Sequence, residues 1–111
     1  MKKTTAIKLN KDFRFLYYRG GSNVSRDLVF YFRKNKQGTN RLGITVSKKV
    51  GKAVTRNRVR RLIKENYRQR EERIKDGYDI VIVARIRAAK ADYWEIGRDM
   101  DFLLRKSDLL A

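Results

Sequence analysis

The sequence contains no cysteine and no histidine. Without cysteine, the chain forms no disulfide and offers no thiolate ligand to a metal ion. Histidine is the commonest metal ligand and the side chain best suited to proton transfer near neutral pH. Catalysis by the polypeptide alone would therefore depend on carboxylates, lysine or tyrosine, and these two absences argue against a self-sufficient enzyme.

Long apolar stretches are missing as well. No run approaches the roughly 20 residues that cross a bilayer as a helix, and the N-terminal segment MKKTTAIKLN lacks the apolar core of a secretory signal. We therefore expect a cytoplasmic protein with no membrane partner.

Acidic residues are scarce relative to basic ones. The 111 residues include 29 Lys and Arg against 12 Asp and Glu, which leaves a net charge of +17. Solubility alone usually needs a net charge of only about 2 to 8 in a small domain. The excess predicts an anionic partner: nucleic acid above all, with an anionic membrane or an acidic protein as alternatives. The length and the 41% of hydrophobic residues indicate a single packed domain over residues 1–111.

Apolar periodicity predicts an α+β fold in which helices pack on one sheet of about four strands. A first helix should begin with Asn10 as its cap and end in a left-handed turn at the glycine pair 20–21. Two alternating segments, 26–34 and 41–47, should pair as a hairpin, and a further strand is expected around 22–24.

The second half of the chain supplies a long helix, a strand and a last helix. The long helix should begin near Thr55 and stop by Gly77, and the apolar run YDIVIVAR predicts a central strand buried on both faces. Asp92 and Glu95 are spaced as a capping box ahead of the last helix. The expected order is α-β-β-(β)-α-β-α.

The segment TRNRVRRLIKENYR, residues 55–68, is half apolar and half cationic. On a helical projection its apolar side chains gather on one face, and the far face carries Asn57, Arg60, Arg61, Lys64 and Arg68. Such a cationic face is either a solvated surface with internal ion pairs or a nucleic-acid-binding surface, and the small number of nearby acids favours the second. The candidate ligands of the nucleic acid are Arg56, Asn57, Arg58, Arg60, Arg61, Lys64 and Arg68.

Aromatic side chains beside a basic loop form a second candidate surface. Phe13 and Tyr17 lie one helical turn apart, and Tyr31 projects from the same face of the expected hairpin as Thr45 and Ser47. Exposed rings flanked by cations bind an unpaired strand by stacking. The alternative is that these rings belong to the core. The candidate residues of this surface are Phe13, Tyr17, Tyr31, Ser47, Lys48 and Lys49.

The segment RLGITVSKKVGKAVTRNRVRRLIKENYR resembles the signature of the bacterial ribonuclease P protein subunit family, whose hallmark is an Arg-Asn-Arg helix start, here residues 56–58. The segments DFRFLYYRG and YDIVIVAR resemble the first helix and the buried strand of that family. The stretch from Asp92 to Leu110 resembles its last helix. The resemblance therefore covers most of the chain.

This resemblance implies a ribonucleoprotein in which a catalytic RNA, with bound Mg²⁺, removes the 5′ leader of precursor tRNA, while the protein does not cut. The Arg-Asn-Arg helix would lie near the catalytic RNA, and the aromatic surface would contact the leader. The implied partners are the catalytic RNA and precursor tRNA, with no obligate protein partner. The implied fold is similar to a ribosomal protein domain and has a left-handed β-α-β crossover through the long helix, although most such crossovers are right-handed.

Two other functions fit the same composition. A structural, ribosomal-type RNA-binding protein needs the basic helix but no aromatic cleft. A metal-dependent nuclease needs clustered carboxylates, whereas the aspartates of this chain are scattered along the sequence. Incubation with precursor tRNA, with and without the catalytic RNA, separates the three functions.

Overall fold

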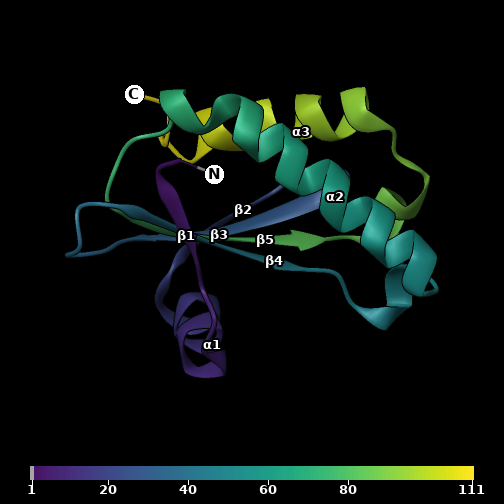
Figure 1. Ribbon diagram of the computed structural model, residues 1–111, viewed down its shortest axis with the longest axis horizontal. Coiled ribbons are helices and arrows are strands. Elements are labelled where there is room, and N and C mark those ends of the chain that lie inside the picture. Colours follow the sequence, from purple (N-terminus) through teal and green to yellow (C-terminus); the bar gives the residue numbers. More distant parts are fainter. Residues whose placement is uncertain (1) are drawn as a thin grey trace.

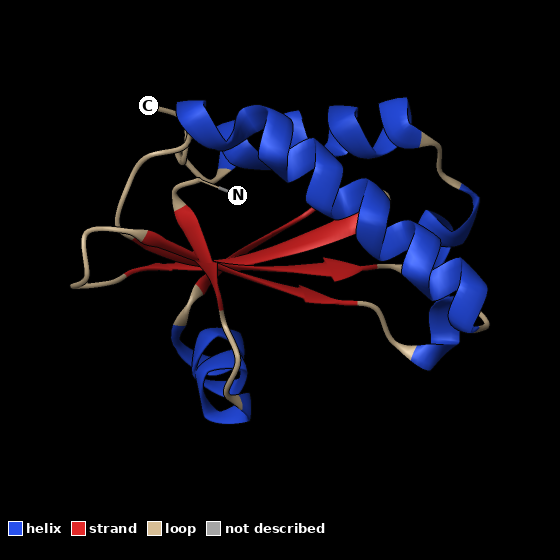
Figure 2. Ribbon diagram, viewed as in Figure 1, coloured by secondary structure: helices blue, strands red, loops and turns tan. Residues whose placement is uncertain are grey.

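The computed structural model describes residues 2–111, which form a five-stranded sheet with helices on both faces (Figure 1 and Figure 2). The helix α1 (Asn10–Arg19) covers one face, and the helices α2 (Ala53–Arg70) and α3 (Tyr93–Lys106) cover the other. The strands are β1 (Thr4–Ala6), β2 (Gly21–Val24), β3 (Leu28–Lys34), β4 (Asn40–Thr45) and β5 (Tyr78–Ala84). Short 3₁₀ turns occupy Lys48–Val50, Glu71–Arg73 and Ile86–Lys90. No helix among the described residues is long and apolar enough to cross a membrane.

The strands lie in the order β1-β4-β5-β3-β2. The predicted central strand is confirmed, because β5 pairs parallel with β4 and antiparallel with β3, and Ile80, Val81 and Ile82 are fully buried. The predicted hairpin between residues 26–34 and 41–47 is wrong, because β5 lies between β3 and β4, and β3 forms its hairpin with β2 instead. The short strand β1 was not predicted, and it gives the sheet five strands rather than about four.

The parallel neighbours β4 and β5 are joined through α2, which forms the β-α-β crossover that the resemblance implied. In Figure 1 both strands run to the right, α2 passes above them, and β1 lies nearest the viewer, so β4 lies in front of β5. This arrangement is left-handed, the rarer hand of such connections.

The helix ends differ in part from those predicted. Asn10 is the first residue of α1 rather than its cap, and Gly20 ends the helix in an extended conformation, at φ −79°, rather than a left-handed one. Glycine is nevertheless required there, because a Cβ would lie 2.6 Å from the carbonyl oxygen of Leu16. The helix α2 ends at Arg70, earlier than predicted, because Ile74 is already paired with Leu110 in an isolated β-bridge. The capping box at the start of α3 is confirmed.

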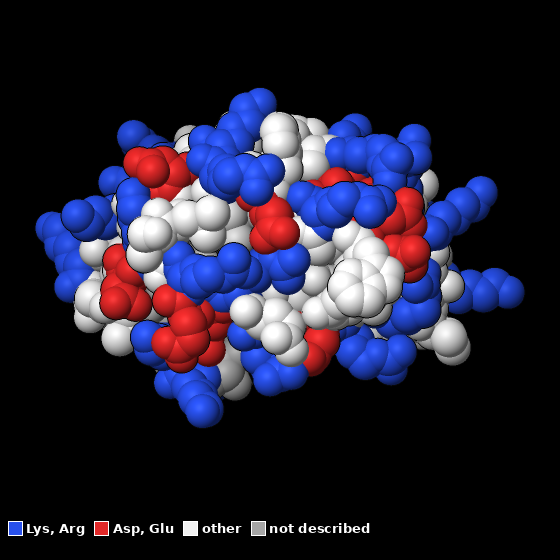
Figure 3. All heavy atoms as spheres, turned by 90° about the horizontal axis from the view of Figure 1, so that it is seen from above, with Lys and Arg blue, Asp and Glu red and all other residues white. Residues whose placement is uncertain are grey.

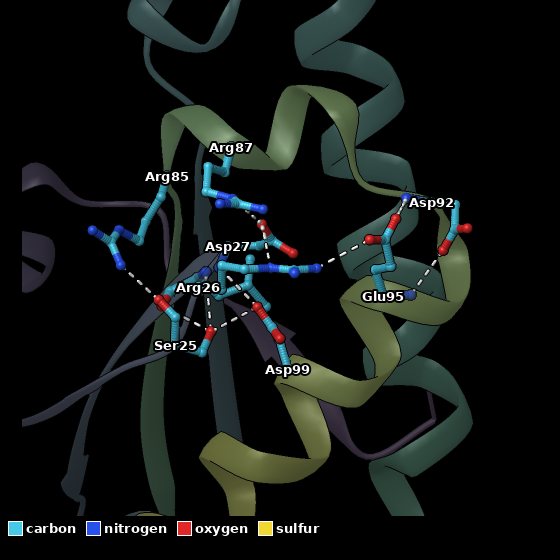
Figure 4. A network of polar contacts seen from close by, with 9 residues as sticks. Ser25, Arg26, Asp27, Arg85, Arg87, Asp92, Glu95 and Asp99 are labelled. Atoms are coloured by element: carbon cyan, nitrogen blue, oxygen red, sulfur yellow. Dashed lines mark hydrogen bonds and ion pairs between the residues drawn. The ribbon is translucent and has the colours of Figure 1, made fainter.

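The β2–β3 hairpin is fixed to α3 through Asp99 (Figure 4). Its Oδ2 atom accepts hydrogen bonds from the Asp27 backbone N–H at 2.7 Å and from Ser25 Oγ at 2.9 Å. The Asp27 carboxylate is only 1% exposed and accepts no hydrogen bond from any described residue. Its nearest cations, Arg26 Nε and Arg87 Nε, both lie 3.9 Å from Oδ1. Burial raises the pKa of Asp27 above its ordinary value, and the nearby charge of Asp99 adds to the increase.

This buried carboxylate makes the stability of the protein depend on pH. Above the raised pKa of Asp27 the folded state carries the full cost of the buried charge, and the cost disappears as the pH falls toward the ordinary value of 3.8. We expect Asp27→Asn to increase the free energy of unfolding at pH 7 by about 1 kcal/mol, and the gain to vanish near pH 4. Thermal melts from pH 4 to pH 8 measure the difference, with the exposed Asp76→Asn as control. A destabilised Asp27→Asn variant at pH 7 would show instead that Arg26 and Arg87 stabilise the ionised form.

Candidate nucleic-acid interface

The helix α2 presents its cations to solvent because its apolar edge is fixed on the sheet. Val59, Ile63 and Tyr67 are buried, and the Tyr67 hydroxyl hydrogen-bonds Thr4 Oγ1 of β1 at 3.0 Å. Figure 3 looks onto α2 and α3 and shows basic side chains over much of this face, with acidic ones among them. The face is therefore cationic, but less uniformly than the sequence pattern predicted.

Three of the predicted ligands on α2 are exposed and free of protein carboxylates. Arg61 and Lys64 make no side-chain hydrogen bond or ion pair with any residue in 2–111. The Arg60 guanidinium donates one hydrogen bond, of 3.2 Å, to Oδ1 of the exposed Asn57. These side chains keep most of their donors available for phosphate oxygens.

The remaining predicted ligands on α2 already have partners within the protein. Arg58 donates hydrogen bonds to the carbonyl oxygens of Ala89 and Ala91, the latter at 3.2 Å, and so holds the turn that precedes α3 against α2. Arg56 donates to the Gly51 carbonyl oxygen at 3.2 Å. Arg68 forms an ion pair with Glu65, and this hydrogen-bonded carboxylate raises the pKa of Arg68.

The predicted aromatic residues come together where α1 packs on the sheet. The rings of Tyr17 and Tyr31 meet edge to face, with centroids 4.9 Å apart, and the Tyr17 hydroxyl lies 3.2 Å from Thr45 Oγ1. The Phe13 ring lies so close to Gly43 that a Cβ there would be 2.5 Å from a ring carbon. Tyr17 is 37% exposed, whereas Phe13 and Tyr31 are half-buried beside the small core under α1. One edge of each ring therefore packs against the small core, and the other edge is accessible to solvent.

Two of the aromatic residues, Phe13 and Tyr17, and two of the α2 cations, Arg60 and Lys64, line a pair of hollows that meet at Phe13, whereas Tyr31 lines neither. One hollow, of about 360 Å³, is lined by Asn10, Phe13, Arg14, Tyr17 and Thr45. The next, of about 390 Å³, is lined by Phe13 together with Arg60 and Lys64 of α2 and residues of β1 and β4. We call the two hollows together the edge groove, because they follow the edge of β4 that β1 leaves unpaired beyond Leu42.

The sequence pattern suggested two separate surfaces, and Asn10 and Arg14 were not assigned to the aromatic one. A signal for these two residues was present, because positions 10, 14 and 17 share the face of α1 that carries Phe13. Thr45 lies two residues after Gly43 on β4, so both residues lie on the face of the sheet that α1 covers.

Ser47, Lys48 and Lys49 lie beyond the end of β4, where all three are exposed. Ser47 and Lys49 line a different hollow, of about 390 Å³, together with Arg26, Arg85 and other residues. None of the three lines the edge groove. The structure thus places these predicted leader ligands next to the aromatic surface rather than in it.

The chain resembles known proteins along nearly its whole length. The family model described as Ribonuclease P matches residues 1–108. The ribonuclease P protein component of Clostridioides difficile (strain 630) is 48% identical over 108 residues, which cover 96% of this chain and 95% of that protein. The structure of the Staphylococcus aureus RNase P protein superposes with a TM-score of 0.88 at 36% identity, covering 96% of this chain and 97% of that one. The RNase P protein from Thermotoga maritima gives a TM-score of 0.81 at 32% identity, covering 90% and 96%.

The internal contacts of Arg58 separate its role from that of Arg61. Arg58→Ala leaves the carbonyl groups of Ala89 and Ala91 without their donor, so we expect a loss of about 1 to 2 kcal/mol in the free energy of unfolding. Arg61→Ala, on the same helix but without a protein partner, should change it by less than about 0.5 kcal/mol. Urea denaturation of both variants measures the difference. Equal stabilities would mean that the Arg58 contacts do not hold the turn.

Proposed function

The chain belongs to the ribonuclease P protein family, and we propose that it acts as the protein subunit of ribonuclease P, an endoribonuclease complex that processes tRNA. Besides family membership, the observation that carries this proposal is the edge groove, in which half-open rings adjoin unpaired cations. A structural RNA-binding protein would need only the cations. No observation favours that alternative.

We infer that the edge groove takes the unpaired 5′ leader of precursor tRNA. Bases stack on aromatic rings whatever their sequence, and the backbone of a single strand follows positive charge. Phe13 and Tyr17 supply the rings, and Arg14 lines the same hollow. The leader of each precursor differs in sequence, so contacts made through ring faces and phosphates suit this substrate.

We further propose that the exposed cations of α2 bind the catalytic RNA. Arg61 lines neither hollow of the edge groove, so its guanidinium can reach a second RNA surface while the leader occupies the groove. Arg60 and Lys64 stand at the junction of the two surfaces. RNA bound along α2 and a leader bound in the edge groove would therefore lie side by side on the protein, which positions the substrate on the catalytic RNA.

The hydrolytic centre in this proposal belongs to the RNA. Within residues 2–111, no three Asp or Glu side chains are grouped so that they could hold a metal ion. Catalytic Mg²⁺ would therefore be bound mainly by RNA oxygens, and it supplies activation of water and stabilisation of the leaving oxygen. The protein contributes positive potential, which lowers the repulsion between the phosphates of the two RNAs.

Tyr17 tests the leader contact. We expect Tyr17→Ala to weaken binding of precursor tRNA to the holoenzyme by about 5-fold or more, since each stacked base contributes about 1 to 3 kcal/mol, and to leave binding of mature tRNA unchanged. The matched control is Tyr18→Ala, because Tyr18 is 85% exposed and lines neither hollow. Filter binding with both tRNA forms measures the ratio. Equal losses for precursor and mature tRNA would contradict leader binding in the groove.

The α2 cations are tested through salt dependence. Removing two phosphate contacts with Arg60→Ala and Arg61→Ala should weaken binding of the catalytic RNA and reduce the slope of log K against log salt by about 2. Lys36→Ala removes an exposed charge from the loop between β3 and β4 and serves as the control. An unchanged slope in the double variant would place the catalytic RNA elsewhere on the protein.

A further inference from the structure

A second exposed aromatic site lies on the opposite face of the sheet from α1. Trp94, in the first turn of α3, is 71% exposed, although most of the apolar side chains of α3 are buried. It is the only tryptophan in the chain. The contacts of the edge groove do not explain its exposure, because Trp94 lines neither of that groove's hollows.

Trp94 borders a groove between α2 and α3 with a volume of about 470 Å³. We call this hollow the α2–α3 groove. Its lining includes Gln69, Arg70, Arg73, Tyr93 and Arg98. At Gly97 the two helices approach so closely that a Cβ would lie 2.8 Å from Asn66 Oδ1. The floor of the groove is therefore closely packed.

The indole ring is held in a defined position. The Tyr93 ring meets it edge to face, with centroids 5.1 Å apart and an interplanar angle of 90°. The Tyr93 carbonyl oxygen accepts a hydrogen bond of 3.1 Å from the buried Asn66 side chain. The capping box of Asp92 and Glu95 fixes the backbone of the same turn. A ring held in this way loses little conformational freedom when a second ring stacks on it.

The charges around the groove favour an anionic ligand. Arg70 is already paired, because its Nε atom donates to Asp101 Oδ1 at 2.6 Å. That contact also engages Asp101, whose pKa is lowered chiefly by the hydrogen bond from Arg70. Arg73 and Arg98 make no side-chain hydrogen bond or ion pair with any residue from 2 to 111. Figure 3 shows uncharged surface lying between basic side chains on this face of the molecule.

We propose that the α2–α3 groove binds an unpaired purine nucleotide of the catalytic RNA, with the base stacked on Trp94 and its phosphates at Arg98 and Arg73. A ring face flanked by free guanidinium groups is the combination that binds single-stranded RNA, and a purine offers the larger face. This inference rests on the proposed function, because it assumes that the protein binds the RNA subunit. It adds a contact on α3 that the edge groove and the α2 cations do not provide.

The catalytic RNA, rather than the leader, is assigned to this groove because of its position. The edge groove opens beside α1, whereas α2 and α3 cover the other face of the sheet (Figure 1). A leader that follows the edge groove would have to pass round α2 to reach Trp94. RNA that lies along α2 reaches the α2–α3 groove directly.

The single tryptophan makes the test direct, because all indole fluorescence comes from Trp94. We expect catalytic RNA, added with Mg²⁺ until the protein is saturated, to protect Trp94 from quenching by acrylamide. A leader oligoribonucleotide alone should not protect it, and neither should anionic lipid vesicles. Unchanged quenching in the saturated complex would overturn the proposal, as would protection by the leader or the vesicles alone.

Variants provide the second measurement. Trp94→Ala should weaken catalytic-RNA binding by about 5-fold or more, and Trp94→Phe should retain most of the affinity because it keeps a stacking face. Phe102→Ala is the matched control, since Phe102 is an exposed α3 aromatic that lies 5.5 Å from Lys106 Nζ and does not line the groove. Wild-type affinity of Trp94→Ala would overturn the proposal. If the wild-type protein still stimulates cleavage of precursor tRNA, only this inference fails; if it does not, the proposed function fails.

Discussion

The packing of α2 on the sheet is the constraint on which the proposed RNA-binding surface depends. Val59, Ile63 and Tyr67 are buried, and each such side chain contributes about 1.5 to 3 kcal/mol when it leaves water. Because this edge is fixed, the rotation of the helix is fixed too, and with it the direction of every other side chain. Arg61 faces solvent and Arg58 faces the turn before α3 for the same reason. The helix therefore uses some of its cations to hold the fold and leaves others exposed to solvent.

The short strand β1 leaves the edge groove open, because it ends before it can cover the rest of β4. Its position is set by the buried Glu71, whose carboxylate oxygens accept hydrogen bonds of 3.2 Å from the backbone N–H groups of Lys2 and Lys3. Pairing with β4 then ends at Leu42, so the edge of β4 beyond that residue has no strand beside it. Phe13 packs over Gly43 at this edge, where any side chain would displace the ring. A longer β1 would cover the groove.

Sequence patterns predicted the elements of this fold better than their arrangement. Alternation identified β3 and β4, a continuous apolar run identified β5, and the spacing of Asp92 and Glu95 located the start of α3. These signals are local. The partner of a strand is set by contacts distant in sequence, so the hairpin between β3 and β4 was wrong and the three-residue β1 was missed. For the same reason, the place of Arg58 in the first turn of the expected helix made it a candidate RNA ligand, whereas the carbonyl groups that it contacts belong to residues 89 and 91.

The acids of the chain strengthen the case for RNA, because most of them are already engaged. Asp79 binds Arg41 at 2.6 Å, Asp101 binds Arg70 at 2.6 Å, and Glu71 holds the N-terminal backbone. These contacts are used within the fold and do not relieve the repulsion among the cations that remain, which leave the molecule at +17. A ligand that binds only the folded chain stabilises it by mass action. RNA bound along α2 and in the edge groove would be attracted by the exposed cations and would reduce the repulsion among them. Binding of RNA and stability of the fold would therefore depend on the same exposed cations.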